Sequence, residues 1–241
     1  MSELLQQLKK DVPAYRPNEQ VRSAFIASEK TFTPLVGPAG VGKTFIAEHV
    51  TDLDPSIQLI DTSTNRWRKD SDPNGFRTAK EHITLEGLAE DIRFGRLINY
   101  DVILETGTIY ATHPEGFRAH HNIGPLTAAN LETFIALGTP LHPVYITSPV
   151  EMWAHFLKES LGERYDTIAT RAPEMIESIE FAQKNLDLFT FIESRSDKGS
   201  VDEAAQAIID LTHNREHTAQ TKESAAQSLE AMRLHALSLA A

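Results

Sequence analysis

One octapeptide constrains the fold of this chain more than any other feature. Residues 37–44 read Gly-Pro-Ala-Gly-Val-Gly-Lys-Thr, which fits the Walker A pattern G-x-x-x-x-G-K-[ST]. An apolar, β-prone run from Phe32 to Val36 stands directly before it, and a helical pattern from Lys43 to Val50 follows it. A strand, a glycine-rich turn and a helix in this order are typical of a backbone nest that binds phosphate groups.

The chemistry of this octapeptide gives each part a role. Glycines let successive backbone N–H groups turn toward phosphate oxygens, and the following helix adds the positive end of its dipole. We expect Lys43 to bridge the β- and γ-phosphates as a catalytic residue and Thr44 to ligate Mg²⁺, so ATP and Mg²⁺ are the predicted cofactors. The predicted nucleotide-binding residues are Gly37, Pro38, Ala39, Gly40, Val41, Gly42, Lys43 and Thr44.

The rest of the chain alternates between strand and helix patterns. Apolar runs predict strands at 57–60, 97–104, 108–110, 143–147 and 188–192, and helical patterns lie at 84–94, 127–136, 150–161, 170–185 and 201–213. The polar stretch 61–78 is predicted to be a loop. This alternation predicts an α/β fold, a three-layer P-loop NTPase with a mainly parallel sheet and a small inserted subdomain.

Composition excludes several classes of function. The 241 residues carry 23 Lys+Arg against 34 Asp+Glu, a net charge of −11, which argues against nucleic acid as a partner. The chain has no cysteine, so disulfides, thiolate catalysis and cysteine metal sites are excluded. No apolar run approaches the roughly 20 residues that span a bilayer, so no membrane association is expected. The first residues lack the apolar segment of a secretory signal, which predicts a cytoplasmic protein. The oligomeric state is not predicted.

A second group of polar residues follows the strand predicted at 57–60. Hydroxyl side chains and then clustered cations occupy residues 61–70, Asp-Thr-Ser-Thr-Asn-Arg-Trp-Arg-Lys-Asp. Such a set suits the phosphate of a second substrate, because guanidinium groups bind phosphate through two hydrogen bonds. A solvated basic loop has the same composition, so both interpretations stay open from these residues alone.

Five segments in order resemble guanylate kinases. The stretch Ser-Thr-Asn-Arg at 63–66 resembles the family's S-T-T-R motif, and 94–100 resembles its G-E-F-[IL]-E-[WY] motif. Residues 107–112 resemble G-x-Y-Y-G-[ST], and 144–149 resemble the strand that ends in [AP]-P-S. Residues 162–181 are similar to the lid and the helix after it. The likeness covers about Leu35 to Ile209.

The resemblance implies the roles of particular side chains. The acceptor phosphate would be held by Ser63, Arg66, Lys69 or Arg68, and Tyr110. Arg164 and Arg171 would be catalytic residues that neutralise the transferring group, where charge develops in the transition state. It also implies a kinase-like domain (32–213) with an acceptor-binding insert (63–112) and a lid (160–173). Helical patterns in the two end segments predict an N-terminal helical extension (1–31) and a C-terminal helical tail (214–241).

The chain departs from the family pattern where the base would be recognised. The acidic residue that reads guanine in the family falls at Asn99, and the second threonine of S-T-T-R is Asn65. Without that carboxylate a hydrogen-bond acceptor for guanine is lost, unless Glu105 or Asp101 replaces it. No acidic strand of the family type is found between Tyr110 and Pro143. GMP is therefore not predicted as the acceptor.

Three functions are compatible with these observations. The first is an ATP-dependent phosphotransferase of the guanylate-kinase type, acting on a nucleoside monophosphate or another small phosphorylated acceptor. The second is a guanylate-kinase-like binding module without activity. The third is a P-loop NTPase without a small acceptor, which the missing acidic strand disfavours.

Overall fold

The structure is a computed structural model that describes residues 3–66, 76–77, 84–104, 106–161, 168–195 and 198–240. The chain divides into two compact units. The first contains Met1–Phe32, Gln58–Asn122 and Ala129–Leu141, and the second contains Thr33–Ile57, Ile123–Ala128 and His142–Ala241.

The larger sheet has five strands in the order β2-β7-β1-β8-β9. These are β2 Ile57–Leu59, β7 His121–Pro125, β1 Thr31–Val36, β8 Val144–Thr147 and β9 Thr190–Glu193. Strand β8 runs parallel to both β1 and β9, with Leu35 opposite Val144 and Tyr145 opposite Phe191. The predicted α/β fold with a mainly parallel sheet is therefore confirmed. In parallel strands the carboxyl ends lie at one edge, so the segments after β1, β8 and β9 begin at the same edge.

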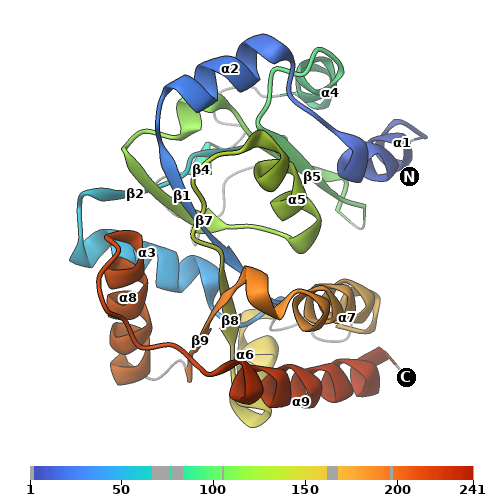
Figure 1. Cartoon of the computed structure of the whole chain (residues 1–241). Helices are drawn as coiled ribbons and strands as arrows, with labels where there is room; N and C mark the ends of the chain where they lie inside the picture. Colours follow the sequence, from blue (N-terminus) through green and yellow to red (C-terminus); the bar gives the residue numbers. More distant parts are fainter. Residues whose placement is uncertain are drawn as a thin grey trace. The chain divides into compact units, whose positions relative to one another are not determined.

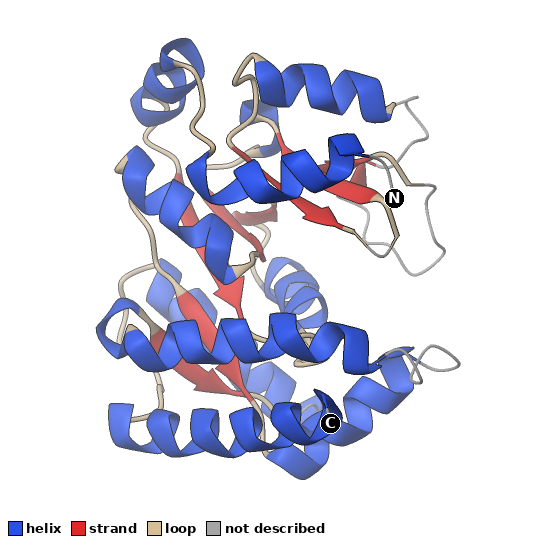
Figure 2. Cartoon of the chain, turned by 90° about the vertical axis from the view of Figure 1, so that its right-hand side faces the viewer, coloured by secondary structure: helices blue, strands red, loops and turns tan. Residues whose placement is uncertain are grey.

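Helices pack on both sides of strands β1, β8 and β9. Figure 1 shows α3 (Lys43–Leu53) and α8 (Lys198–Thr212) on one side, and α7 (Ile168–Lys184) and α9 (Lys222–Ala240) on the other. In Figure 2 the same strands are drawn in red between blue helices. Helix α6 (Val150–Leu161) follows β8 directly. The predicted helices 43–50, 150–161, 170–185 and 201–213 are all confirmed in type, and the helix-prone tail is helical as α9.

Two histidine–carboxylate contacts join α3 to α8. His49 Nε2 lies 2.5 Å from Asp202 Oδ1, and His213 Nε2 lies 2.7 Å from Asp54 Oδ2 at the end of α3. Hydrogen bonds from Ser56 and His213 lower the pKa of Asp54 to about 2. These contacts fix the helix that begins at Lys43 along its carboxyl-terminal half.

The first unit is built on a sheet of order β4-β3-β6-β5. Its strands are β4 Phe76–Arg77, β3 Thr62–Thr64, β6 Thr108–Thr112 and β5 Asn99–Ile103, and its helices include α1 Glu3–Asp11, α2 Glu19–Ala27, α4 Leu85–Arg93 and α5 Ala128–Leu137. Buried side chains of α1, α4 and the sheet form one core, which contains Leu5, Leu88, Tyr100, Ile109 and Ala111. The residues predicted as an N-terminal extension thus share their core with the residues predicted as an insert.

One prediction about local structure is wrong, and one strand was not predicted. The stretch 61–78 is not one loop, because β3 and β4 form within it and pair with each other in parallel. Strand β7 was not predicted at all, since Asn122, Gly124 and Pro125 make its sequence resemble a turn. The structure nevertheless places β7 between β2 and β1, and Leu126 N donates to Leu35 O directly after it.

Candidate nucleotide and acceptor sites

The glycine-rich turn lies between β1 and α3 in the second unit and has the backbone conformation that a phosphate nest requires. Gly37, Gly40 and Gly42 have φ angles of 149°, 80° and 84°, a region that other L-residues avoid. Gly42 caps α3, and Ile46 N donates to Gly42 O at 2.9 Å. A Cβ atom on Gly37 would lie 2.9 Å from Ile146 O of β8, so the turn also needs glycine for its close approach to the neighbouring strand.

The side chain of Lys43 folds back over this turn. Its Nζ donates to Gly37 O at 2.7 Å and to Pro38 O at 2.9 Å. Burial lowers the pKa of the Lys43 ammonium to about 8, while the carboxylate of Glu174 in α7 raises it. The ammonium is therefore held at the turn, where the negative charge of a bound polyphosphate would stabilise its protonated form.

This pKa predicts how nucleotide affinity depends on pH. Lys43 is cationic below about pH 8 and loses its charge above it, and bound phosphate favours the charged form. We expect the wild-type protein to bind Mg–AMP-PNP about tenfold more weakly at pH 9 than at pH 7. Equilibrium dialysis across this range measures the effect. Lys43→Arg stays charged throughout and should give a flat profile, whereas a flat wild-type profile would contradict the prediction.

The predicted metal ligand, Thr44, lies in the first turn of α3. Its hydroxyl fits Mg²⁺ as one oxygen ligand beside phosphate oxygens and water. Strand β7, next to β1, contains no acidic residue. Among the residues that the structure describes, no group of three histidines or carboxylates is placed to hold a metal ion. Thr44 therefore stays the predicted Mg²⁺ ligand from this turn.

Arg171 belongs to α7, in the same unit as the glycine-rich turn. Glu174 is three residues further along this helix and lies near enough to Lys43 to raise its pKa. Glu174 of α7 thus acts electrostatically on Lys43 in the turn. The other predicted catalytic cation, Arg164, lies outside the described residues, as do Arg68, Lys69 and Glu105.

In the first unit, Arg66 and Tyr110 are brought together. Arg66 Nε donates to Tyr110 Oη at 3.1 Å, and the guanidinium carbon lies 5.8 Å from the centre of the tyrosine ring. Asn65, the residue before Arg66, ties this segment to the start of β6. Its side chain accepts from Ile109 N at 2.8 Å and donates to Gly107 O at 3.0 Å. A cation and a phenol in contact suit the phosphate of an acceptor.

The side chain of Ser63 lies on the opposite face of the sheet from Tyr110. Ser63 pairs with Ala111 across β3 and β6, and directly opposite residues share a face of the sheet. Tyr110 precedes Ala111 and therefore points to the opposite face. The structure does not bring Ser63 and Tyr110 together, although the resemblance implies that both bind one phosphate.

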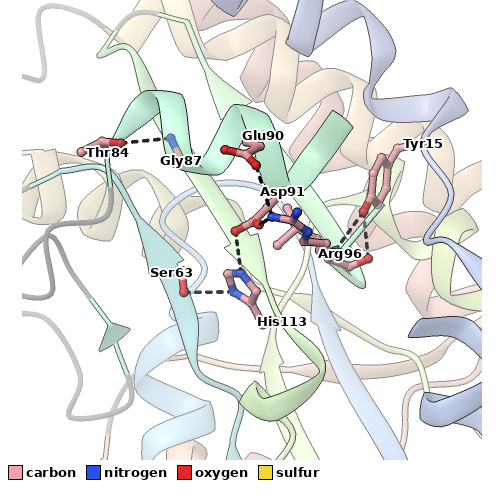
Figure 3. A network of polar contacts seen from close by, with 9 residues as sticks. Tyr15, Ser63, Thr84, Gly87, Glu90, Asp91, Arg96 and His113 are labelled. Carbon is pink, nitrogen blue, oxygen red and sulfur yellow. Dashed lines mark hydrogen bonds and ion pairs between the residues drawn. The ribbon is translucent and has the colours of Figure 1, made fainter. Parts of the chain in front are cut away.

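Ser63 instead takes part in a polar network with α4 (Figure 3). Its Oγ lies 3.3 Å from His113 Nδ1, and His113 Nε2 lies 3.2 Å from Asp91 Oδ2. Asp91 also accepts from Arg96 at 3.1 Å, and Glu90 lies 3.7 Å from the same guanidinium. Since Ser63 is only 4% exposed, its hydroxyl is committed to holding α4 on the sheet.

Asn99 and Asp101 point to the same face as Tyr110, because Asp101 pairs directly with Tyr110 across β5 and β6. Asn99 is 6% exposed, and in the described part of the chain its Oδ1 has no hydrogen-bond partner. Asp101 binds Lys9 at 2.9 Å. The amide of Asn99 thus keeps an unused acceptor on the face that carries Arg66 and Tyr110, whereas Asp101 is engaged by α1.

Sequence reasoning missed the support that α6 gives to the turn. Trp153 Nε1 donates to Ala39 O at 2.8 Å, and the Leu157 side chain packs against the backbone of Gly40. The contacts of His113 with Ser63 and Asp91 were not predicted either. A tryptophan on the inner face of a helix looks like ordinary core in a sequence, so no local signal pointed to either contact.

No protein-family model matches the chain, and no curated protein matches it. Among solved structures it is similar to the guanylate kinase from Anaplasma phagocytophilum, with 11% sequence identity and a TM-score of 0.49. The match covers 77% of this chain and 84% of that one. A similarity of this size assigns neither a family nor an activity to the chain. None of the helices in the described part of the chain is long and apolar enough to cross a bilayer.

Proposed function

We propose that the chain binds ATP with Mg²⁺ at residues 37–44 and transfers the γ-phosphoryl group to a small phosphorylated acceptor. The observation that carries the proposal is the glycine-rich turn, which has three glycines at positive φ and the Lys43 ammonium bound to the carbonyls of Gly37 and Pro38. This arrangement favours a polyphosphate over other anions, because backbone N–H groups and one ammonium share the charge.

In the proposed reaction an oxygen of the acceptor attacks the γ-phosphorus. The bond from that phosphorus to the β,γ-bridging oxygen breaks, and ADP leaves with the bond electrons. Lys43 stabilises the charge on the β- and γ-phosphates, and Arg171 and Arg164 neutralise the equatorial oxygens. Bound Mg²⁺, with Thr44 as a ligand, supplies further charge neutralisation to the phosphates.

The acceptor class is proposed from the first unit. Arg66 and Tyr110 form a cation–phenol pair that suits a phosphate monoester, and Asn99 offers a buried amide on the same face. An amide donates and accepts, so it suits the mixed donor and acceptor edge of a nucleobase. A nucleoside monophosphate is therefore the proposed acceptor, with no preference for guanine.

An acceptor panel tests this function. ADP release from Mg–ATP should rise at least tenfold with one nucleoside monophosphate and stay at its basal rate with sugar phosphates. Nucleotide binding without any acceptor-dependent turnover would reject the kinase and leave a nucleotide-dependent binding module. Rapid hydrolysis without acceptor would instead indicate an NTPase.

Arg66→Ala separates acceptor binding from nucleotide binding. We expect the KM for the acceptor to rise about tenfold or more, since a charged hydrogen bond to phosphate is lost, while the affinity for Mg–AMP-PNP stays unchanged. Tyr110→Phe is the matched variant, because it removes only the hydroxyl that accepts from Arg66, and its effect should be smaller. Equal KM values in wild type and Arg66→Ala would remove Arg66 from the acceptor site.

A further inference from the structure

The glycine-rich turn is supported from outside by the buried face of α6. Trp153 is fully buried, and its indole Nε1 donates to Ala39 O at 2.8 Å. A trans peptide is planar, and its C=O and N–H point in opposite directions. With Ala39 O directed at α6, the N–H of Gly40 in the same peptide is directed away from α6.

Gly40, the residue after Ala39 in the turn, also packs against α6. A Cβ atom on Gly40 would lie 2.7 Å from Leu157 Cδ2, so the backbone lies directly on the Leu157 side chain. Trp153 and Leu157 are four residues apart and share one face of α6. This face therefore fixes the orientation of the peptide that joins Ala39 to Gly40.

The C-terminal helix reaches the same tryptophan. The ring of His235 in α9 meets the Trp153 ring edge to face, with centroids 5.6 Å apart and an interplanar angle of 70°. His235 Nε2 is buried and has no hydrogen-bond partner among the described residues. Around it, Leu229, Met232 and Ala236 of α9 are fully buried. The imidazole thus holds its place through ring contact rather than through a hydrogen bond.

We propose that Trp153 and His235 are positioning residues of the phosphate-binding turn, so that α9 forms part of the nucleotide site. His235 holds the indole, and the indole orients the Ala39–Gly40 peptide so that its N–H serves as one donor of the nest. This inference rests on the nucleotide binding proposed above and adds to it a helix about 180 residues further along the chain.

Affinity for Mg–AMP-PNP, measured by equilibrium dialysis, tests the contacts. Trp153→Phe keeps an aromatic ring and removes the donor, and should weaken binding about three- to tenfold. His235→Ala should weaken it about threefold, whereas His235→Phe keeps the edge-to-face contact and should bind as wild type does. Leu234→Ala, at an exposed neighbouring position in α9, is the control and should have no effect.

A spectroscopic signature separates positioning from general stability. The chain has two tryptophans, so Trp67→Phe leaves Trp153 as the sole reporter. In this background Mg–AMP-PNP should change the Trp153 emission. The change should persist with His235→Phe and shrink with His235→Ala, even when both variants unfold at the same temperature.

The outcomes distinguish the two proposals. Wild-type protein that is folded and fails to bind Mg–AMP-PNP overturns the nucleotide site and this inference together. Wild-type protein that binds, with His235→Ala binding equally tightly and showing the same emission change, overturns the inference and leaves the nucleotide site standing. If Trp153→Phe does not fold, the two His235 variants still decide the question.

Discussion

Lys43→Ala is expected to reduce acceptor-dependent ADP release about 100- to 1,000-fold, the loss typical of removing one charge-stabilising donor from an active site. The ammonium lies 2.7 Å from Gly37 O and 2.9 Å from Pro38 O, and no other lysine among the described residues donates a hydrogen bond to this turn. Its removal should also weaken Mg–AMP-PNP binding, because the charge acts in both the ground state and the transition state.

A matched control is available in the same unit. Lys184 is an exposed lysine at the end of α7, and Lys184→Ala should leave both turnover and affinity unchanged. Folding of Lys43→Ala is checked by circular dichroism and by its thermal midpoint. Turnover within threefold of wild type in a folded Lys43→Ala protein would show that the turn does not handle the transferring phosphate.

Gly40→Ala is expected to destabilise the protein by about 2–5 kcal/mol, through two additive causes. The first is a left-handed backbone at φ 80°, which costs a non-glycine residue about 1–2 kcal/mol. The second is overpacking, since the new Cβ would lie 2.7 Å from Leu157 Cδ2 in a buried contact, at a typical cost of about 1–3 kcal/mol. The free energy of unfolding from urea titration measures the sum.

Gly42→Ala separates the two causes. Gly42 has nearly the same φ, 84°, but a Cβ there meets no atom of the described residues within 4 Å, so only the backbone cost should appear. The difference between the two variants reports the contact with Leu157. In a double-mutant cycle, Leu157→Ala should cancel that difference. Equal destabilisation of both glycine variants would mean that the contact between Leu157 of α6 and Gly40 adds no steric cost.

The strand, glycine-rich turn and helix around residues 37–44 were predictable because their signals are local. The strand 32–36, the turn and the helix from Lys43 follow one another within twenty residues, and each has its own pattern. Strand β8 and helix α6 were predictable for the same reason. An apolar run with β-branched residues and a helical repeat after it need no information from elsewhere in the chain.

Strand β7 shows what local patterns cannot reveal. Its sequence, His-Asn-Ile-Gly-Pro, has the composition of a turn, and it becomes a strand because β2 and β1 both pair with it. Tertiary pairing overrides the propensity of these residues. The short strands β3 and β4 were not predicted for a similar reason. The three polar residues of β3 and the two residues of β4 form strands only by pairing with segments that are distant in the sequence.

Of the proposed acceptor residues, the structure brings two into contact and separates a third from them. Arg66 and Tyr110 were named from the resemblance, and they are in contact. Ser63 was assigned to the same phosphate, but its face is decided by the register of β3 against β6, which sequence spacing does not fix. His113 and Asp91 hold Ser63 on the face toward α4 and were not predicted, because the three residues are brought together only by the fold.

Isothermal titration calorimetry of the wild-type chain with Mg–ATP tests the central claim most directly. The account predicts saturable binding at one site per chain at pH 7, with much weaker binding to Lys43→Ala under the same conditions. A folded wild-type protein that shows no saturable heat with Mg–ATP, or a Lys43→Ala protein that binds as tightly as wild type, would contradict a phosphate nest at residues 37–44.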